Sequence, residues 1–275
     1  MALFELNFNS QYLGGNTEIS VIMPDKGWGQ DAAEFYGSGE KYKVLWLLHG
    51  AFGDSTDWIR KSNIEIYATE KNLIVVMPSA LNSGYSNDTT LRYNMWDFLT
   101  KELMPLVYNW LPASDKREDN YIAGLSMGGF GTAKYAVNYP EKFAAAAVLS
   151  GPPSNYRKVL EDQEKNGDGA GNLMLVNAMK NFGSKEEFLD SYENTWERLA
   201  EKAGTGKLPR FYFACGKKDF LYQSFTEFRK YAEQIGLDAE FEEIEGYGHE
   251  WRFWDLTIQH ALDFFGIPDA PAPQM

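Results

Sequence analysis

Tyr121-Ile122-Ala123-Gly124-Leu125-Ser126-Met127-Gly128 is an apolar run that leads into the pattern Gly-x-Ser-x-Gly. The apolar residues predict a buried strand, and the residues after Ser126 predict a helix from Met127 to about Asn138. In this pattern a tight strand-to-helix turn strains the serine, and glycines are needed beside it because larger side chains do not fit. The pattern alone arises by chance in about 10% of chains of this length. The strand before it and the helix after it make Ser126 the candidate nucleophile.

The rest of the chain predicts a mostly parallel sheet. Apolar runs at 44–48, 73–77, 143–149 and 211–215 alternate with amphipathic helical patterns, which is typical of a parallel sheet covered by helices on both faces. The helical patterns lie at 96–110, 127–138, 221–235 and 251–265. We therefore expect one α/β domain that spans residues 1–275.

The two ends of the sheet carry a different signal. Runs at 3–8 and 17–23 flank Gly14-Gly15 and predict an antiparallel hairpin. In residues 239–244 apolar residues alternate with acidic ones, which predicts an edge strand. The polar stretch 25–41 is expected to be a surface loop.

Residues 152–208 are too many for an ordinary connection between strands. A Gly-rich middle is followed by helical patterns at 173–180 and 185–202. We interpret 152–208 as a helical insertion, or lid, after the sixth strand.

Composition narrows the class of protein. The 275 residues are 44% hydrophobic, which is enough for a large core, and the net charge of -13 disfavours nucleic acid and anionic membrane as partners. No apolar run reaches the roughly 18 residues of a membrane span. The first residues show no secretory signal, so we expect a cytoplasmic protein, with a secreted protein whose signal has been removed as the alternative. The single cysteine, Cys215, is expected to be a buried thiol.

A serine needs a base, and histidine, with an unperturbed pKa of about 6.5, is the usual one. The chain has three histidines. His49 ends a strand and His260 lies in a helical pattern, whereas His249 lies in a loop after the last strand. We expect His249 to be the base and His49 to shape its own loop.

An acid that orients the histidine is expected in a loop after a strand, in the chain order serine, acid, histidine. Asp219 meets both conditions. Asp255 lies inside a predicted helix, and Glu250 is too close to His249 in sequence to face its ring. Acyl transfer also needs donors for the oxyanion, for which we expect the backbone N–H groups of Met127 and Ala51. This chemistry needs no metal and no cofactor.

Several segments resemble the bacterial esterases grouped with esterase D, most closely the tributyrin esterase and feruloyl esterase branch. The resemblance covers about 44–265 and depends on Leu48-His49-Gly50, Ala123 to Gly131, Tyr139 to Phe143, Cys215 to Leu221 and Gly248 to Trp251. It implies an α/β-hydrolase fold, the same triad, and cofactor-free hydrolysis of short acyl or aromatic acyl esters. The implied substrates are small-molecule or carbohydrate-linked esters. Relatives often form dimers or tetramers, and the acidic surface does not forbid a homo-oligomer.

The substrate stays open at this point. S-formylglutathione hydrolases usually carry a serine at the position of His49 and a histidine at that of Leu125, so this thioesterase activity is an alternative. An acyltransferase with the same triad is another, and a non-catalytic binding protein is a third. Aromatic residues expected beside the pocket favour a feruloyl group as one specific acyl group. The predicted substrate-binding residues are Phe52, Trp196, Phe220 and Trp251.

Overall fold

The computed structural model describes residues 1–166 and 179–270. Its main sheet has eight strands in the order β1-β2-β4-β3-β7-β8-β9-β10. The strands are β1 (Ala2–Ser10), β2 (Gly15–Met23), β3 (Val44–Leu48), β4 (Ile74–Pro78), β7 (Asn120–Leu125), β8 (Ala145–Leu149), β9 (Arg210–Gly216) and β10 (Ala239–Ile244). The pairings of β1 with β2 and of β2 with β4 are antiparallel, and every other pairing in this sheet is parallel.

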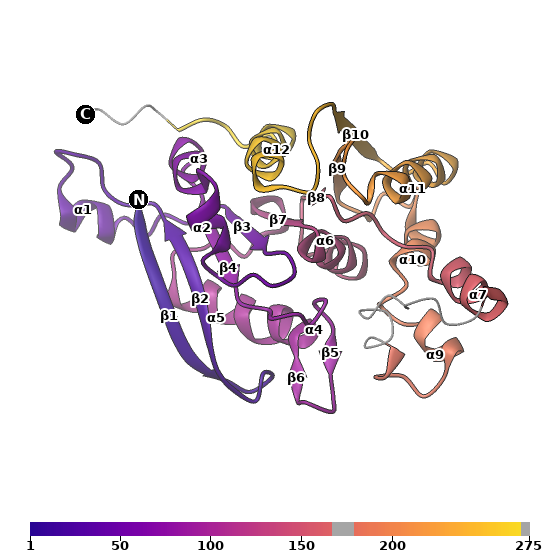
Figure 1. Cartoon of the computed structure of the whole chain (residues 1–275). Helices are drawn as coiled ribbons and strands as arrows, with labels where there is room; N and C mark the ends of the chain where they lie inside the picture. Colours follow the sequence, from indigo (N-terminus) through magenta and orange to yellow (C-terminus); the bar gives the residue numbers. More distant parts are fainter. Residues whose placement is uncertain (167–178, 271–275) are drawn as a thin grey trace.

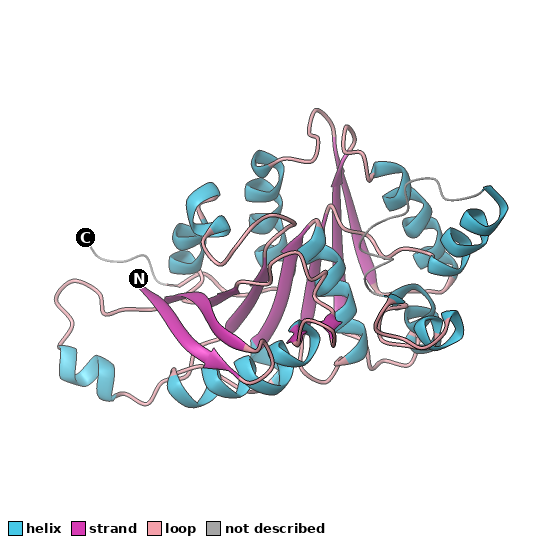
Figure 2. Cartoon of the chain, turned by 60° about the horizontal axis from the view of Figure 1, so that its bottom comes forward, coloured by secondary structure: helices cyan, strands magenta, loops and turns pink. Residues whose placement is uncertain are grey.

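Helices cover both faces of the sheet (Figure 2). The helices are α1 (Ala32–Gly37), α2 (Asp57–Lys61), α3 (Ile64–Glu70), α4 (Met95–Phe98), η1 (Leu99–Leu103), α5 (Met104–Trp110), η2 (Arg117–Asp119), α6 (Met127–Asn138), α7 (Tyr156–Asn166), α9 (Lys185–Leu189), α10 (Thr195–Lys202), α11 (Tyr222–Gln234) and α12 (Trp251–Phe264). Side chains of α4, α5, α6, α10 and α11 share one core with one face of the sheet. Side chains of α2, α3 and α12 form a second core on the other face.

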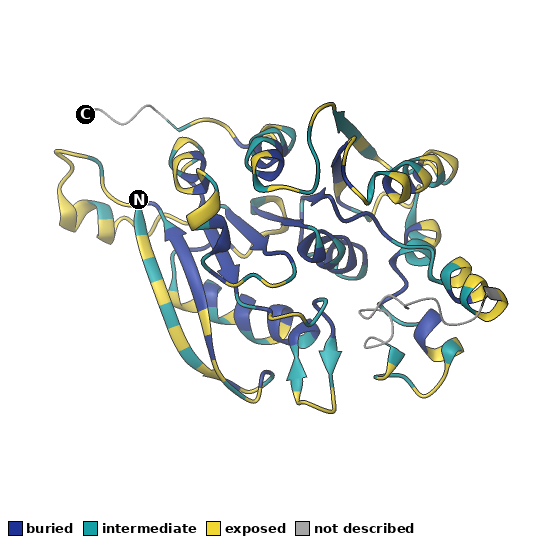
Figure 3. Cartoon of the chain, viewed as in Figure 1, coloured by how far each residue is buried: buried dark blue, intermediate teal, exposed yellow. Residues whose placement is uncertain are grey.

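Burial follows the position of each strand in the sheet (Figure 3). β3, β4, β7 and β8 are buried at every residue, because helices cover both of their sides. β1 lies at one edge and alternates between half-buried and exposed residues until Ser10. β10 lies at the other edge, as its acidic alternation predicts. The expected α/β-hydrolase architecture, with its N-terminal hairpin, is confirmed.

Three local expectations need correction. The stretch 25–41 contains α1, which begins where the Asp31 side chain accepts a hydrogen bond from the Glu34 N–H and which has no buried residue. The helix expected at 96–110 is interrupted by a π-helical segment, η1. A two-stranded sheet of β5 (Asn87–Asp88) and β6 (Tyr93–Asn94) precedes it and has no counterpart in the apolar pattern.

The segment 152–208 contains three described helices. α7 was not predicted, and the single pattern at 185–202 is two helices, α9 and α10, because Asn194 caps a new helix in its middle. The pattern predicted at 173–180 lies mostly outside the described residues. In Figure 1 these helices lie at the opposite end of the molecule from the β1–β2 hairpin. A lid function for this segment stays a prediction.

The side chains of 152–208 tie it to the rest of the chain. Leu199 of α10 is fully buried in the core that it shares with α6. Lys202 donates to the Val137 carbonyl oxygen at 2.7 Å, and Asn138 of α6 donates to the Tyr192 carbonyl oxygen at 3.1 Å. Inside the segment, Arg157 of α7 forms a two-bond ion pair with Glu197 of α10. α10 is therefore packed as part of the domain. Within the described residues, no helix is both long and apolar enough to cross a membrane.

Candidate active site

Ser126 occupies the sharp turn between β7 and α6. Its φ of 51° and ψ of -117° lie in a region that non-glycine residues seldom adopt, and such strain persists only where the surrounding structure holds it. The Ser126 N–H donates to the Leu149 carbonyl oxygen at 2.8 Å, and its own carbonyl oxygen accepts from Phe130. The turn projects the hydroxyl from the carboxyl end of the strand.

The glycines of the pattern allow backbones to meet around this turn. A Cβ on Gly124 would collide with the carbonyl group of Gly128, and a Cβ on Gly128 would collide with the carbonyl oxygens of Leu48 and His49. These neighbours are backbone atoms, which cannot rotate away. The sequence requirement for glycine at both positions therefore follows from the close approach of α6 to β3 and β7.

The structure brings Ser126, His249 and Asp219 together. His249 Nε2 lies 2.9 Å from Ser126 Oγ, and His249 Nδ1 lies 2.9 Å from Asp219 Oδ2. With the proton on Nδ1, the ring donates to the aspartate and accepts from the serine. The Asp219 side chain is fully buried and that of His249 is 19% exposed, so the acid is shielded and the base reaches the surface. These are the three residues predicted from motif and chain order.

Asp219 is held as a carboxylate. Burial alone would raise its pKa, but hydrogen bonds from His249, the Leu221 N–H and the Ser150 hydroxyl outweigh burial and lower the pKa below its usual value. Ser150 also accepts from Trp254 Nε1 at 3.1 Å, and the Trp254 ring lies edge-on to the His249 ring. Sequence reasoning missed Ser150 and Trp254, since neither belongs to a motif.

His49 supports the loop opposite the serine. Its Nε2 accepts from the Ala80 N–H at 2.8 Å and its Nδ1 donates to the Gly50 carbonyl oxygen at 2.6 Å, while burial lowers its pKa. Both ring nitrogens are therefore engaged, as expected for a histidine that shapes the loop. A Cβ on Gly50 would lie 3.4 Å from Ser126 Cβ, which places this loop directly against the nucleophile.

The predicted oxyanion donors lie at the two segments that meet there. Met127 is the first residue of α6, so its N–H has no acceptor within the helix. Among the hydrogen bonds of the described residues, none uses the Ala51 N–H. Their role in binding an oxyanion stays a prediction.

The four predicted substrate-binding residues have different surroundings. Phe220 is 75% exposed and rests on the His249 ring, with centroids 4.5 Å apart, and Phe52 is 92% exposed. Trp251 packs edge-on against Trp58 and Trp254. Trp196 is half-buried and stacks on Tyr231 of α11 with centroids 4.1 Å apart, and its contact with a substrate stays a prediction. Of the four predicted residues, Phe220 is the one whose ring contacts a triad residue.

Within the described part of the chain, no group of three or more His, Cys, Asp or Glu side chains is placed to hold a metal ion.

The fold, with a serine, a histidine and an aspartate at the carboxyl ends of its parallel strands, defines a serine hydrolase of the α/β-hydrolase class. The chain belongs to the Esterase family, whose model matches residues 10–265. It is therefore a carboxylic ester hydrolase.

Similar proteins agree with this class. An acetyl esterase of Caldicellulosiruptor saccharolyticus is 30% identical over 96% of this chain and 98% of its own length. Two Staphylococcus aureus structures each cover 96% of this chain and 98% of their own. The fluorophosphonate-binding serine hydrolase FphF, with substrate bound, is 29% identical with a TM-score of 0.79. The S-formylglutathione hydrolase FrmB is 30% identical with a TM-score of 0.76.

A ferulic acid esterase has a TM-score of 0.75, but at 19% identity this similarity shows the fold alone. It covers 96% of this chain and 97% of its own. The class of hydrolase is therefore common to all these proteins, whereas the acyl group is not.

Proposed function

We propose that the chain hydrolyses esters of short carboxylic acids through an acyl intermediate on Ser126. The observation that carries this proposal is the hydrogen-bonded series Ser126 Oγ, His249 Nε2, His249 Nδ1 and Asp219 Oδ2. A serine hydroxyl is a weak nucleophile until a base takes its proton, and this arrangement supplies the base and orients it. The acetyl esterase that is 30% identical supports a short acyl group.

The reaction has two halves. Ser126 Oγ bonds to the ester carbonyl carbon while its proton moves to His249 Nε2, and the N–H groups of Met127 and Ala51 stabilise the oxyanion. The carbon–oxygen bond to the alcohol then breaks, and the alcohol leaves with the proton from His249. Water repeats the sequence on the acyl-enzyme, giving the free acid and restoring Ser126.

Two further substrates remain as candidates. The similarity to FrmB, an S-formylglutathione hydrolase, favours a test with S-formylglutathione. The aromatic acyl group expected from the sequence is tested with methyl ferulate, and Phe220, exposed beside His249, favours a test with esters of aromatic alcohols such as phenyl acetate. An acyltransferase is the third alternative, because an alcohol in place of water would accept the same acyl group.

The test is a substrate panel with a matched variant. We expect kcat/KM to be highest for acetyl or butyryl esters and lower for longer acyl, feruloyl and S-formylglutathione substrates. Ser126→Ala is expected to lower kcat by roughly 10⁶-fold while the circular dichroism spectrum is kept. Ser224→Ala, at an exposed serine of α11, is the control. Substantial activity in Ser126→Ala would contradict the mechanism, and a dominant thioester or feruloyl activity would replace the proposed acyl group. Addition of a competing alcohol, with ester products measured, distinguishes transfer from hydrolysis.

A further inference from the structure

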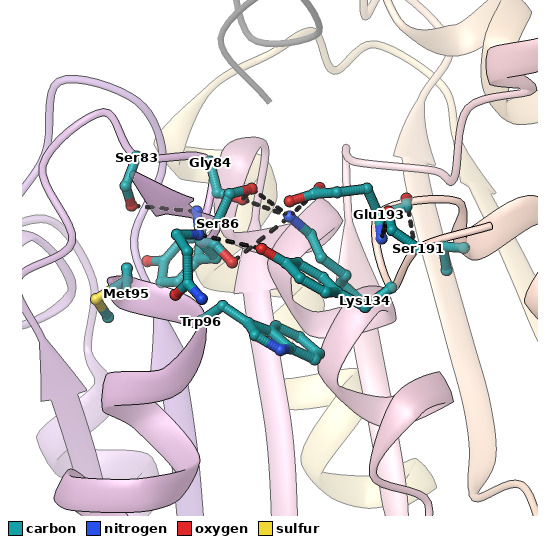
Figure 4. Close-up of polar contacts among 12 residues, drawn as sticks. Ser83, Gly84, Ser86, Met95, Trp96, Lys134, Ser191 and Glu193 are labelled. Atoms are coloured by element: carbon teal, nitrogen blue, oxygen red, sulfur yellow. Dashed lines mark hydrogen bonds and ion pairs between the residues drawn. The ribbon is translucent and has the colours of Figure 1, made fainter. Parts of the chain in front are cut away.

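Lys134 lies about two turns of α6 beyond Ser126. Although lysine is rarely buried, this residue is only 4% exposed. Its ammonium group donates to the Gly84 carbonyl oxygen at 2.9 Å and to Ser86 Oγ at 2.7 Å, and it pairs with Glu193 Oε2 at 2.7 Å (Figure 4). Three donors thus have three close acceptors, and Lys134 joins α6 to the 84–86 loop and to the turn before α10.

Glu193, in contrast, is only partly satisfied. The residue is 3% exposed, and Oε2 is paired with Lys134. Its other carboxylate oxygen, Oε1, is buried and accepts no well-formed hydrogen bond from the described residues, although the Glu193 carboxylate lies close enough to the Tyr192 hydroxyl to add to the rise that burial causes in the pKa of Tyr192. A buried charged oxygen without a donor costs free energy, so this atom calls for an explanation.

Glu193 and Lys134 line a cavity of about 40 Å³. One water molecule needs about 10–15 Å³ of such space, so the cavity accepts a group of only a few heavy atoms. Its wall includes Met127, the residue that follows the nucleophile. We call it the Lys134–Glu193 cavity; its other lining residues include Phe130, Pro153 and Tyr156.

The side of the nucleophile on which this cavity lies indicates which half of an ester enters it. The leaving alcohol takes its proton from His249, so the alcohol must lie beside the His249 loop. The described residues that line the cavity come from 84–86, 127–134, 153–156 and 193–195, and none comes from the loops that carry Asp219, Phe220 or His249. The cavity therefore lies beside Met127 and away from the side of the leaving alcohol.

We propose that the Lys134–Glu193 cavity is an acyl subsite for short acyl groups that carry a hydroxyl group, and that Glu193 Oε1 accepts the hydrogen bond of this hydroxyl. This inference depends on the proposed function, because it assigns the acyl half of the same substrate. Lys134 balances the charge of Glu193, so a neutral donor fits better than an ammonium group, which would be desolvated beside a second cation. Hydrolysis would release a short hydroxy acid and an alcohol.

The experiment compares esters that differ by one hydroxyl. Ethyl lactate is paired with ethyl propanoate, and ethyl 3-hydroxybutanoate with ethyl butanoate, with kcat/KM measured from released acid. A hydrogen bond to a charged acceptor favours the hydroxy ester by about tenfold in at least one pair, after correction for alkaline hydrolysis of each ester. Corrected ratios of about threefold or less in both pairs would overturn the subsite.

Two variants test whether the preference for the hydroxy esters depends on Glu193 and Lys134. Glu193→Gln keeps an amide oxygen for Lys134 and puts an NH₂ group in place of Oε1, so the corrected ratio is expected to fall toward one. Lys134→Met with Glu193→Leu replaces the pair by apolar side chains, which avoids an unpaired buried charge, and is expected to reverse the preference. Because each ratio is measured within one preparation, partly folded enzyme does not alter it. A wild-type ratio in Glu193→Gln would overturn the role of Glu193.

The same four esters distinguish a failure of the proposed acyl subsite from a failure of the proposed esterase function. If all four esters are hydrolysed at similar rates and this activity is lost in Ser126→Ala, the subsite proposal is contradicted and the serine esterase function still holds. Hydrolysis that persists in Ser126→Ala contradicts the proposed function itself.

Discussion

Ser126 Oγ lies 2.9 Å from His249 Nε2, although 123 positions of the chain separate the two residues. β7 supplies the serine, and the loop after β10 supplies the histidine. Both residues follow strands of one parallel sheet, whose carboxyl ends meet at a single edge.

Replacement of Asp219 tests how the base is oriented. Asp219→Asn would present an amide to His249 Nδ1 and favour the ring tautomer that cannot accept the serine proton. By analogy with the same change in chymotrypsin-like enzymes, we expect kcat to fall by about 10⁴-fold. Asp263→Asn, on the exposed side of α12, is the control. Wild-type kcat in Asp219→Asn would show that another acid orients His249.

Asp219 also contributes to the pH dependence of stability. Its pKa is lowered in the folded protein, so its stabilising effect is fully present above the unfolded pKa of about 3.9 and is lost as pH falls through the folded pKa. The difference in unfolding free energy between the wild type and Asp219→Asn should therefore be larger at neutral pH than in acid. Urea unfolding at a series of pH values measures it. A difference that grows toward acid pH would be inconsistent with a lowered pKa.

Gly128 tests the packing of the serine turn. Gly128→Ala would press a methyl group into the carbonyl oxygens of Leu48 and His49, which we expect to cost about 1–3 kcal/mol of stability and most of the activity. Gly15→Ala adds a methyl group with nothing within 4 Å, and its effect should stay within about 0.5 kcal/mol. Thermal unfolding compares the two variants. Equal midpoints would mean that the turn tolerates a side chain.

Phe220 tests the alcohol side of the site. Its ring rests on His249, where the leaving group must receive its proton. Phe220→Ala should reduce kcat/KM for phenyl acetate by up to about tenfold more than for methyl acetate, since an aromatic contact contributes about 0.5–1.5 kcal/mol. Leu91→Ala, another exposed apolar residue, is the control. An equal loss for both esters would indicate that Phe220 only supports the His249 ring.

The triad was predictable because each member follows a recognisable strand. The apolar runs that become β7, β9 and their neighbours are unambiguous, and the turn chemistry of Gly124 to Gly128 needs glycine for reasons that the backbone contacts make plain. The order of the strands in space gives the meeting point of Ser126, Asp219 and His249. Only the pairing of the strands, which determines distances, required the structure.

The polar surroundings of the site were not predictable in the same way. Lys134 and Glu193 belong to helical or turn segments in which charged residues are normally exposed, and their burial depends on contacts between segments about 50 to 60 residues apart. Ser150 stands at a strand end without any motif, yet its hydroxyl helps to hold Asp219. Trp196 was predicted beside the substrate because it is aromatic and lies on or beside a loop expected around the pocket, and its stacking on Tyr231 could not be read from the sequence.

The most direct test of the account is to trap the acyl group. The protein is mixed with p-nitrophenyl acetate, quenched in acid within the first turnover, digested and analysed by mass spectrometry. We expect one acetyl group on the peptide that contains Ser126. In His249→Ala the yield of this acetyl peptide rises only if the replacement slows deacylation more than acylation. Hydrolysis by the wild type with the acetyl group on a different residue, or with no adduct at any quench time, would contradict an acyl intermediate on Ser126.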